Sequence, residues 1–323
     1  MSSSVLDICI ASDWEYDRGF TDRLERALQS AGRTTFVVWP HNLYDTLERI
    51  RCGELAFHYL YDRASNTSCE FLEIHRLLEN GLVGCLDDPR KMIRASDKAV
   101  MHAELLRANV PVPRARIIPA FDAAHEPCLA PGDLAAFGRP FVVKPTVSAG
   151  GGLGVVEACE LEEVLAARRQ YPQVRYLIQE KVVPMMREGL RFWFRIFYVC
   201  GSVIATWWDD RTHVYRPVSE SELVEHRLDG VVEIVRRIAS ASGLRFFSTE
   251  IVRDVAGRLL VVDYINETCD MRCQSVCADG VPDAVIEKAV SRLAAVVLGE
   301  LAGRPASTGS GESGRSGPIG PTS

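Results

Sequence analysis

The chain has 323 residues, of which 47% are hydrophobic and 25% charged, and it carries a formal net charge of −6. This length predicts two or three lobes around a sizeable core, and the acidic balance with scattered basic residues excludes a nucleic-acid-binding footprint. No apolar stretch reaches the roughly 18–20 residues of a membrane span, and the start does not have the pattern of a signal peptide. The ten cysteines form no CxxC. We therefore expect a cytoplasmic protein with reduced thiols and no membrane partner.

The first third alternates short apolar strands with amphipathic helices. Strands are expected at 5–11, 34–39, 54–63 and 81–88, with helices at 20–32 and 69–81 between them. This alternation predicts a parallel sheet with helices on its faces. The segment contains no GxGxxG, which argues against a dinucleotide site of the usual kind.

The pattern then changes. A helix is expected over 96–109, with Ser96 as its N-cap and prolines after its end, followed by a connector at 119–140. Strands dominate from 140 onward, interrupted by one helix at 219–243 and closed by another at 282–301. From Gly303 the chain is nearly all Gly, Ser, Pro and Thr, which predicts disorder because so little apolar surface is available to offset chain entropy.

The stretch FVVKPTVSAGGGLGVVE, residues 141–157, places Lys144 a few residues before a glycine cluster. Consecutive glycines let backbone N–H groups converge on an anion, and a lysine adds a charge suited to phosphate. A Walker A loop has its lysine after the glycines, and a Rossmann loop opens a helix, so neither fits. Two interpretations remain: a loop between antiparallel strands that folds over phosphates, and a plain glycine hairpin.

Two carboxylates lie near the ends of later apolar strands. Glu250 occurs in FSTEIV and Asp263 in VVDYIN. Mg²⁺ prefers oxygen ligands and usually takes one or two carboxylates, with water and phosphate oxygens completing its shell. The pair therefore predicts a magnesium site, although Glu250 also fits a surface position on an alternating strand.

The ordered set of these features resembles the ATP-grasp superfamily of carboxylate–amine and carboxylate–thiol ligases, over about residues 88–300. The set comprises Lys98, Lys144, the glycine loop, Gln179–Glu180, Arg195, Glu250, Asp263 and Asn266. The resemblance implies a mixed α/β and α+β fold, with a Rossmann-like N-terminal lobe followed by a two-lobe ATP-grasp fold. The implied boundaries are 1–88 for the first lobe, 89–180 for the lobe with the glycine loop, 181–302 for the lobe with the metal site and 303–323 for the tail.

The resemblance also implies roles for individual residues. Arg195 would neutralise the transferring phosphoryl group, and Glu250, Asp263 and Asn266 would hold one or two Mg²⁺, with Mn²⁺ as an alternative. The family usually places its second carboxylate two residues before the metal-binding Asn, whereas here the two are three apart. Either a β-bulge keeps both side chains aimed at the metal, or one of them is not a ligand. The implied ATP-binding residues are Lys98, Lys144, Ser148, Gly150, Gly151, Gly152, Gly154, Gln179, Glu180, Lys181, Val183 and Glu188.

The activity implied by the resemblance is an ATP-dependent ligase that joins a small carboxylate to an amine through an acyl phosphate, giving ADP and phosphate. A small-molecule kinase and a nucleotide-binding regulatory module are the alternatives. Many members of the superfamily are dimers, which makes a homodimer one option, but no pattern in this sequence marks an interface. At the substrate end, Arg272 follows the metal strand and fits either a clamp for a substrate carboxylate or a salt bridge to Asp270 or Glu267. Arg63 and Asn66 lie on a loop after a strand, a common ligand position in α/β proteins.

Overall fold

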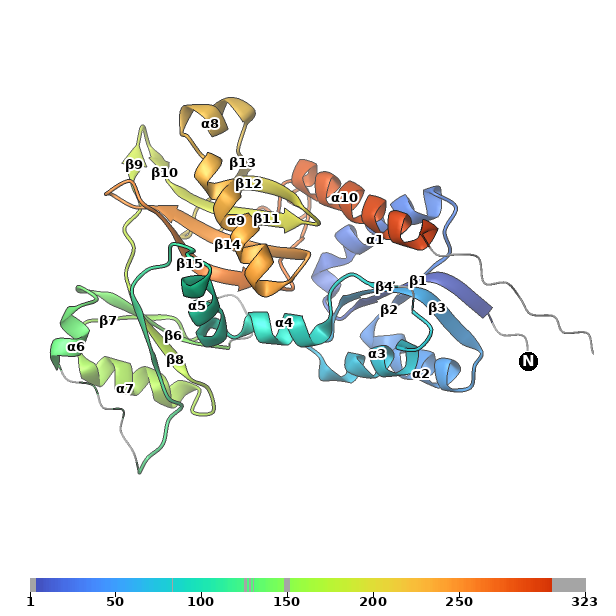
Figure 1. Cartoon of the computed structure of the whole chain (residues 1–323), viewed down its shortest axis with the longest axis horizontal. Coiled ribbons are helices and arrows are strands. Elements are labelled where there is room, and N and C mark those ends of the chain that lie inside the picture. Colours follow the sequence, from blue (N-terminus) through green and yellow to red (C-terminus); the bar gives the residue numbers. More distant parts are fainter. Residues whose placement is uncertain are drawn as a thin grey trace, which may run out of the picture.

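The computed structural model describes residues 4–82, 84–124, 127, 129, 131–147 and 152–303. The predictions for Ser148, Gly150, Gly151 and the tail from 304 onward lie outside these residues. Within them the strands form three main sheets and one two-stranded hairpin, and the three main sheets occupy different parts of the molecule (Figure 1). No helix in these ranges is both long and apolar enough to cross a membrane.

The N-terminal sheet is parallel, as the alternation of strands and helices predicted. Its strand order is β2-β1-β3-β4. Along β1, Ile8 and Ile10 enter one core and Cys9 and Ala11 enter another, because successive side chains point to opposite faces of the sheet. The elements are β1 (Ser4–Ser12), β2 (Thr35–Val38), β3 (Leu55–Arg63), β4 (Gly84–Cys85), α1 (Arg18–Ser30), α2 (Leu43–Arg51) and α3 (Leu72–Leu78), with 3-10 turns at Glu15–Asp17, Pro40–Asn42 and Cys69–Phe71.

Two helices lead from this sheet to the rest of the chain, where the sequence predicted one. They are α4 (Pro89–Ser96) and α5 (Lys98–Arg107). The predicted N-cap at Ser96 is wrong, because Asp97 is extended at φ −79° and ψ 105° and its carboxylate accepts hydrogen bonds from the backbone N–H groups of Ala99 and Val100. Asp97 therefore ends α4 and begins α5 in a single step.

A four-stranded antiparallel sheet follows, with the order β5-β8-β6-β7. One face packs its apolar side chains, among them Phe141, Val143 and Ile178, against Val164 and Ala167 of a helix. Lys144 alternates with Phe141 and Val143 on β6, so it comes from the opposite face. The elements are β5 (Ala115–Ile118), β6 (Phe141–Pro145), β7 (Val156–Ala158), β8 (Tyr176–Glu180), α6 (Pro131–Ala135) and α7 (Leu161–Gln170).

The third sheet is five-stranded and antiparallel, with the order β13-β12-β11-β14-β15. One face is buried under α9 through residues such as Phe194, Ile196 and Phe247. The other face packs Phe197 and Val199 into a core shared with α10 and the parallel sheet. This core joins the five-stranded sheet to the N-terminal sheet (Figure 1). The strands are β11 (Trp193–Val199), β12 (Ser202–Trp208), β13 (Tyr215–Pro217), β14 (Phe246–Arg253) and β15 (Leu259–Asn266), and α10 spans Asp283–Ala302.

The helix predicted at 219–243 is two helices. These are α8 (Glu220–Glu225) and α9 (Asp229–Ser242), and between them Arg227 has a φ of 49°, which a continuous right-handed helix does not allow. A small hairpin of β9 (Met186–Arg187) and β10 (Leu190–Arg191) precedes β11.

Candidate functional site

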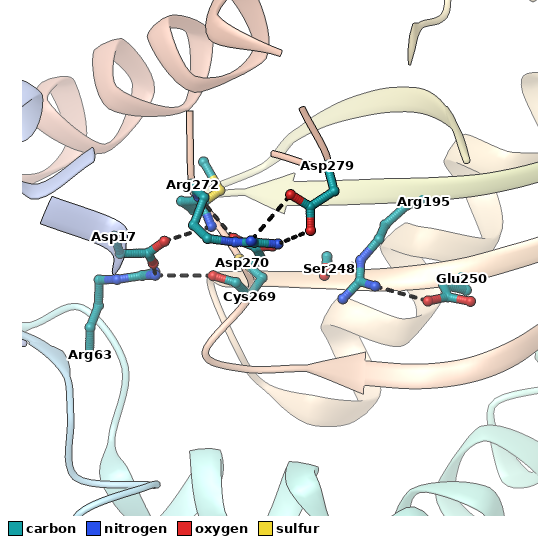
Figure 2. A network of polar contacts seen from close by, with 10 residues as sticks. Asp17, Arg63, Arg195, Ser248, Glu250, Cys269, Asp270, Arg272 and Asp279 are labelled. Atoms are coloured by element: carbon teal, nitrogen blue, oxygen red, sulfur yellow. Dashed lines mark hydrogen bonds and ion pairs between the residues drawn. The ribbon is translucent and has the colours of Figure 1, made fainter. Parts of the chain in front are cut away.

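A row of charged side chains crosses three neighbouring strands of the five-stranded sheet. Arg195 on β11 pairs in register with Glu250 on β14, and Glu250 pairs with Asp263 on β15. Residues directly opposite one another in a sheet point to the same face, so the three side chains lie side by side. Arg195 Nη1 donates a hydrogen bond to Glu250 Oε1 at 2.9 Å (Figure 2).

Both carboxylate oxygens of Glu250 are held in place. Trp193 lies two residues before Arg195 on β11 and therefore on the same face, and its indole Nε1 donates to Glu250 Oε2 at 3.0 Å. Arg195 Nε also donates to Ser248 Oγ at 3.3 Å, which fixes the plane of the guanidinium group. Burial raises the pKa of Glu250, and Asp263 adds to this, while Arg195 opposes it.

A β-bulge accounts for the unusual spacing of Asp263 and Asn266. Ser248 pairs with Asn266 and Glu250 pairs with Asp263, so two steps along β14 correspond to three steps along β15. The extra residue restores the alternation, and Asn266 Nδ2 donates to Asp263 Oδ2 at 3.0 Å. The bulge thus brings both side chains to the same place on the sheet, as the first of the two interpretations required.

Two lysines from outside the sheet approach this row. Lys98, the first residue of α5, places Nζ 3.7 Å from Asp263 Oδ1. Lys144 reaches across from β6 and donates from Nζ to the backbone carbonyl of Val262 at 2.8 Å. The four-stranded and five-stranded sheets therefore meet at these side chains.

The surrounding charges shift the pKa values of these groups. Burial lowers the pKa of Lys144 to about 8, an effect that Asp263 opposes and Lys98 reinforces. Burial alone would raise the pKa of Asp263, but Lys98, Lys144 and Arg195 outweigh it and hold this pKa at about 2. Asp263 is therefore ionised and Lys144 largely protonated near neutral pH.

The row fits a magnesium ion by its chemistry. Asp263 Oδ1 is buried and has no hydrogen-bond partner in the part of the chain that the structure describes. A second carboxylate and an amide oxygen lie beside it, and Mg²⁺ bound together with phosphates needs only one or two carboxylates from the protein. Among the described residues, no three His, Cys, Asp or Glu side chains are grouped so that they could hold a metal ion. These residues therefore contain no metal site built from three such side chains.

The residues expected near the adenine lie at the end of β8 and just beyond it. Gln179 is buried and donates from Nε2 to the hydroxyl of Tyr264 at 3.2 Å, while Lys181 pairs with Glu157 at 2.6 Å. Glu180 lies 3.9 Å from Arg258, and Val183 is exposed. The Gln179 side chain thus already has a protein partner, and the backbone N–H of Glu180 donates to the carbonyl of Arg114 at 2.9 Å.

Glu188 does not lie on β8 or directly after it. It lies in the turn of the β9–β10 hairpin, where its φ is 52°. Its side chain is largely exposed and lies 3.5 Å from Arg187.

In the predicted glycine loop after β6, Gly152 and Gly154 both have positive φ, of 71° and 77°. A Cβ at Gly154 would come within 2.6 Å of the Tyr171 ring, so only glycine fits there.

The arginines at the substrate end are paired with protein carboxylates. Arg272 forms salt bridges with Asp270 at 2.8 Å and Asp279 at 2.9 Å (Figure 2). Of the two interpretations of Arg272, this structure therefore shows the salt bridge to Asp270. Arg63 is buried, pairs with Asp17 and donates to the carbonyl of Cys269 at 3.0 Å.

Asn66, the other residue suggested on that post-strand loop, donates from Nδ2 to the backbone carbonyl of Glu267 at 2.6 Å and to its carboxylate at 2.9 Å. Arg63 and Asn66 therefore dock the loop that follows β15 onto the N-terminal lobe.

Sequence reasoning missed two residues of the site. Trp193 holds Glu250, and its position two residues from Arg195 on a strand was the available signal. Tyr264 is buried between the sheets, where its hydroxyl lies 2.7 Å from His102 Nδ1 and accepts from Gln179, and Lys144 Nζ lies 5.6 Å from its ring centroid. No pattern in VVDYIN distinguishes it from an ordinary core tyrosine.

Many solved structures are similar to this chain in fold. An ATP-grasp RimK domain protein from Sphaerobacter thermophilus superposes with a TM-score of 0.60 and 18% identity, over 90% of this chain and 99% of that one. D-alanine–D-alanine ligase from Bacillus anthracis in complex with ATP gives a TM-score of 0.62 and 11% identity, over 92% and 97%. The D-cycloserine synthetase DcsG gives 0.59 and 16%, over 91% and 100%.

Sequence comparison adds nothing to these similarities: no protein-family model matches the chain, and no curated protein sequence matches it. At such low identities the likeness establishes the fold.

Proposed function

The chain has the ATP-grasp fold, and from this premise we propose that it is an ATP-dependent ligase that joins a small carboxylate to an amine. The observation that carries the proposal is the row of Arg195, Glu250 and Asp263 on one sheet, faced by Lys98 and Lys144 from other elements. Three cations and two carboxylates converge there from separate elements of the chain. A fold kept only as a scaffold has no need to bury so many charges in one place.

The proposed reaction has two steps. The γ-phosphoryl group of ATP passes to a carboxylate oxygen of the first substrate, giving an acyl phosphate and ADP. The amine of the second substrate then attacks the acyl carbon, the C–O bond to phosphate breaks, and phosphate leaves as the amide forms. The amine loses a proton in this step, so the net products are an amide, ADP and phosphate.

The residues contribute charge and position. Phosphoryl transfer depends on orientation and charge neutralisation more than on covalent help from the protein. Lys98 and Lys144 would bind phosphate oxygens, and Arg195 would neutralise the group in transit while Trp193 and Ser248 keep Glu250 and Arg195 oriented. Glu250, Asp263 and Asn266 would hold one or two Mg²⁺, which when bound would neutralise phosphate charge, and Mn²⁺ is an alternative to it.

A trapping assay tests the reaction class. The protein is incubated with Mg-ATP, hydroxylamine and pooled small carboxylic acids that include amino acids. The proposal expects ADP, phosphate and a hydroxamate together, because hydroxylamine intercepts an acyl phosphate. A new phosphorylated compound without free phosphate or hydroxamate would instead establish a small-molecule kinase.

A pair of variants tests the site. Glu250→Gln removes one carboxylate and also leaves Arg195 without its partner, so ATP turnover should fall by at least about 10²-fold, which is typical for loss of one charge-stabilising group. Glu233→Gln is the matched control, because Glu233 lies on α9 and pairs with Arg237 on the surface of that helix. Retention of full ATP turnover in Glu250→Gln would remove Glu250 from the proposed site, whereas a nucleotide-binding scaffold or regulator would show no turnover even in the wild type.

A further inference from the structure

Tyr215 is a buried tyrosine at the edge of the charged row. It opens β13 and pairs in register with Trp208 on β12, and only 3% of its surface is exposed. Its ring lies 4.3 Å from the Trp208 ring and 6.2 Å from that of Phe197. These two rings fix the direction of the side chain along the face of the sheet that carries Arg195.

No described residue forms a hydrogen bond with the hydroxyl of Tyr215, and this oxygen is not one of the fully buried unpaired atoms, so it borders accessible space where a ligand atom could meet it. Its side chain lies in the electrostatic field of three charged groups: Arg195, Asp270 and Glu250. These charged groups belong to the row on the sheet and to the loop that follows β15, so the Tyr215 side chain lies near both. Burial raises its pKa, so the phenol keeps its proton and remains a hydrogen-bond donor.

Arg195, which packs on the same indole as Tyr215, has an unused donor. Its Nε is bound to Ser248 and its Nη1 to Glu250, whereas Nη2 makes no hydrogen bond within the described ranges of the chain. Its guanidinium carbon lies 5.4 Å from the centroid of the Trp208 ring, so Trp208 supports both Arg195 and Tyr215. Two donors, one charged and one neutral, are thus held by the same indole.

We propose that the Tyr215 hydroxyl and Arg195 Nη2 together bind one oxyanion of the reaction, either the phosphoryl group in transit or the carboxylate that receives it. This inference rests on the proposed function and extends it, since it adds a neutral donor to the cations of the site. Asp270 and Glu250 border the same space, and their negative charge restricts the oxyanion to the position that Tyr215 and Arg195 define.

The test uses small probes, so that it does not depend on the identity of the substrate. The full-length protein is saturated with Mg-ADP and titrated by calorimetry with inorganic phosphate in one arm and acetate in the other. Wild type, Tyr215→Phe and Tyr198→Phe are compared. Tyr198 is the matched control, because it lies on the same sheet but its ring stacks on Phe247 at the opposite face.

Tyr215→Phe should weaken binding of a probe about tenfold, the effect of one hydrogen bond to a charged group, while Tyr198→Phe binds as wild type does. A loss in the phosphate arm assigns the donor to the phosphoryl group, and a loss in the acetate arm assigns it to the carboxylate. Equal binding by wild type and Tyr215→Phe, or no binding of either probe to the wild type, would overturn the inference. Failure of Mg-ADP itself to bind would overturn the proposed function, and with it this extension.

Discussion

Lys144 Nζ donates a hydrogen bond to the backbone carbonyl of Val262, at 2.8 Å, and thereby joins β6 of one sheet to β15 of another. Val262 directly precedes Asp263, so the lysine binds the strand that carries the proposed metal ligand. Without a nucleotide this contact satisfies a buried ammonium group. Binding of a phosphate oxygen would give the same ammonium group a stronger, charged partner.

Lys144→Met should therefore abolish most ATP turnover without unfolding the protein. Methionine fills a similar volume but cannot bind phosphate, and loss of one such donor costs about 10²–10³ in rate. ATP turnover and far-UV circular dichroism measure the two effects. Lys288→Met is the control, because Lys288 lies exposed on α10 and has no part in the proposed site. Wild-type turnover in Lys144→Met would remove this lysine from the site.

Asn266 provides a test of the bulge on β15. If the bulge presents Asn266 to the metal, Asn266→Ala should raise the Mg²⁺ concentration for half-maximal activity by about 10–100-fold, the range seen when groups around a metal are removed. Asn266→Asp keeps an oxygen at this position and should lose less. A titration with Mg²⁺ at saturating ATP gives the values. An unchanged Mg²⁺ requirement in Asn266→Ala would mean that Asn266 only orients Asp263.

The sequence predicted those parts of the fold that depend on local pattern. The parallel N-terminal sheet followed from alternating strands and helices. Glu250 and Asp263 were expected near the ends of apolar strands but lie in the middle of β14 and β15, and Arg195 was expected only from the resemblance. The bulge was one of two open interpretations, because a three-residue spacing by itself does not show which residue is extra.

Contacts between distant segments could not be predicted in this way. Arg63 pairs with Asp17, which is distant in the chain, and a sequence pattern does not show that the two side chains meet. The salt bridge between Arg272 and Asp270 is local, and it was one of the two interpretations of Arg272. Likewise the break between α4 and α5 depends on whether Ser96 or Asp97 caps the second helix, and both residue types are good caps. The role proposed for Tyr215 depends on the register between β12 and β13, which the sequence does not show.

The buried pair of Asp17 and Arg63 should be a major contributor to stability. Both side chains are almost fully buried, and Asp17 also accepts a hydrogen bond from the backbone N–H of Met271 at 3.0 Å. Removing one charge leaves the other buried and unpaired, which costs about 3–5 kcal/mol. Asp17→Asn should therefore lower the free energy of unfolding in urea by an amount in this range.

The exposed pair of Asp209 and Arg211 is the comparison for that experiment. Their side chains are 33% and 67% exposed, so Asp209→Asn should change the free energy of unfolding by less than about 1 kcal/mol. Equal effects of the two substitutions would contradict the assignment of Asp17 and Arg63 as the contact that docks the loop after β15.

Asp87 predicts a pH dependence of stability. It accepts hydrogen bonds from the backbone N–H groups of Arg245 at 2.8 Å and Phe246 at 3.1 Å, but burial dominates and raises its pKa to about 7. In the unfolded chain this pKa is about 4. The folded state therefore binds more protons between these two values, and the contribution of Asp87 to the free energy of unfolding falls as pH rises through that window.

Asp87→Asn cannot ionise, so the free energy of unfolding of wild type minus that of the variant should decrease between about pH 4 and pH 7. Urea unfolding across this range measures it. The adjacent Asp88 is the control with the opposite sign, because the hydrogen bond from Arg90 lowers its pKa. For Asp88→Asn the same difference should stay constant above about pH 5 and fall only at lower pH, where Asp88 becomes protonated. A difference for Asp87→Asn that rises with pH would show that the two backbone hydrogen bonds outweigh the burial of this carboxylate.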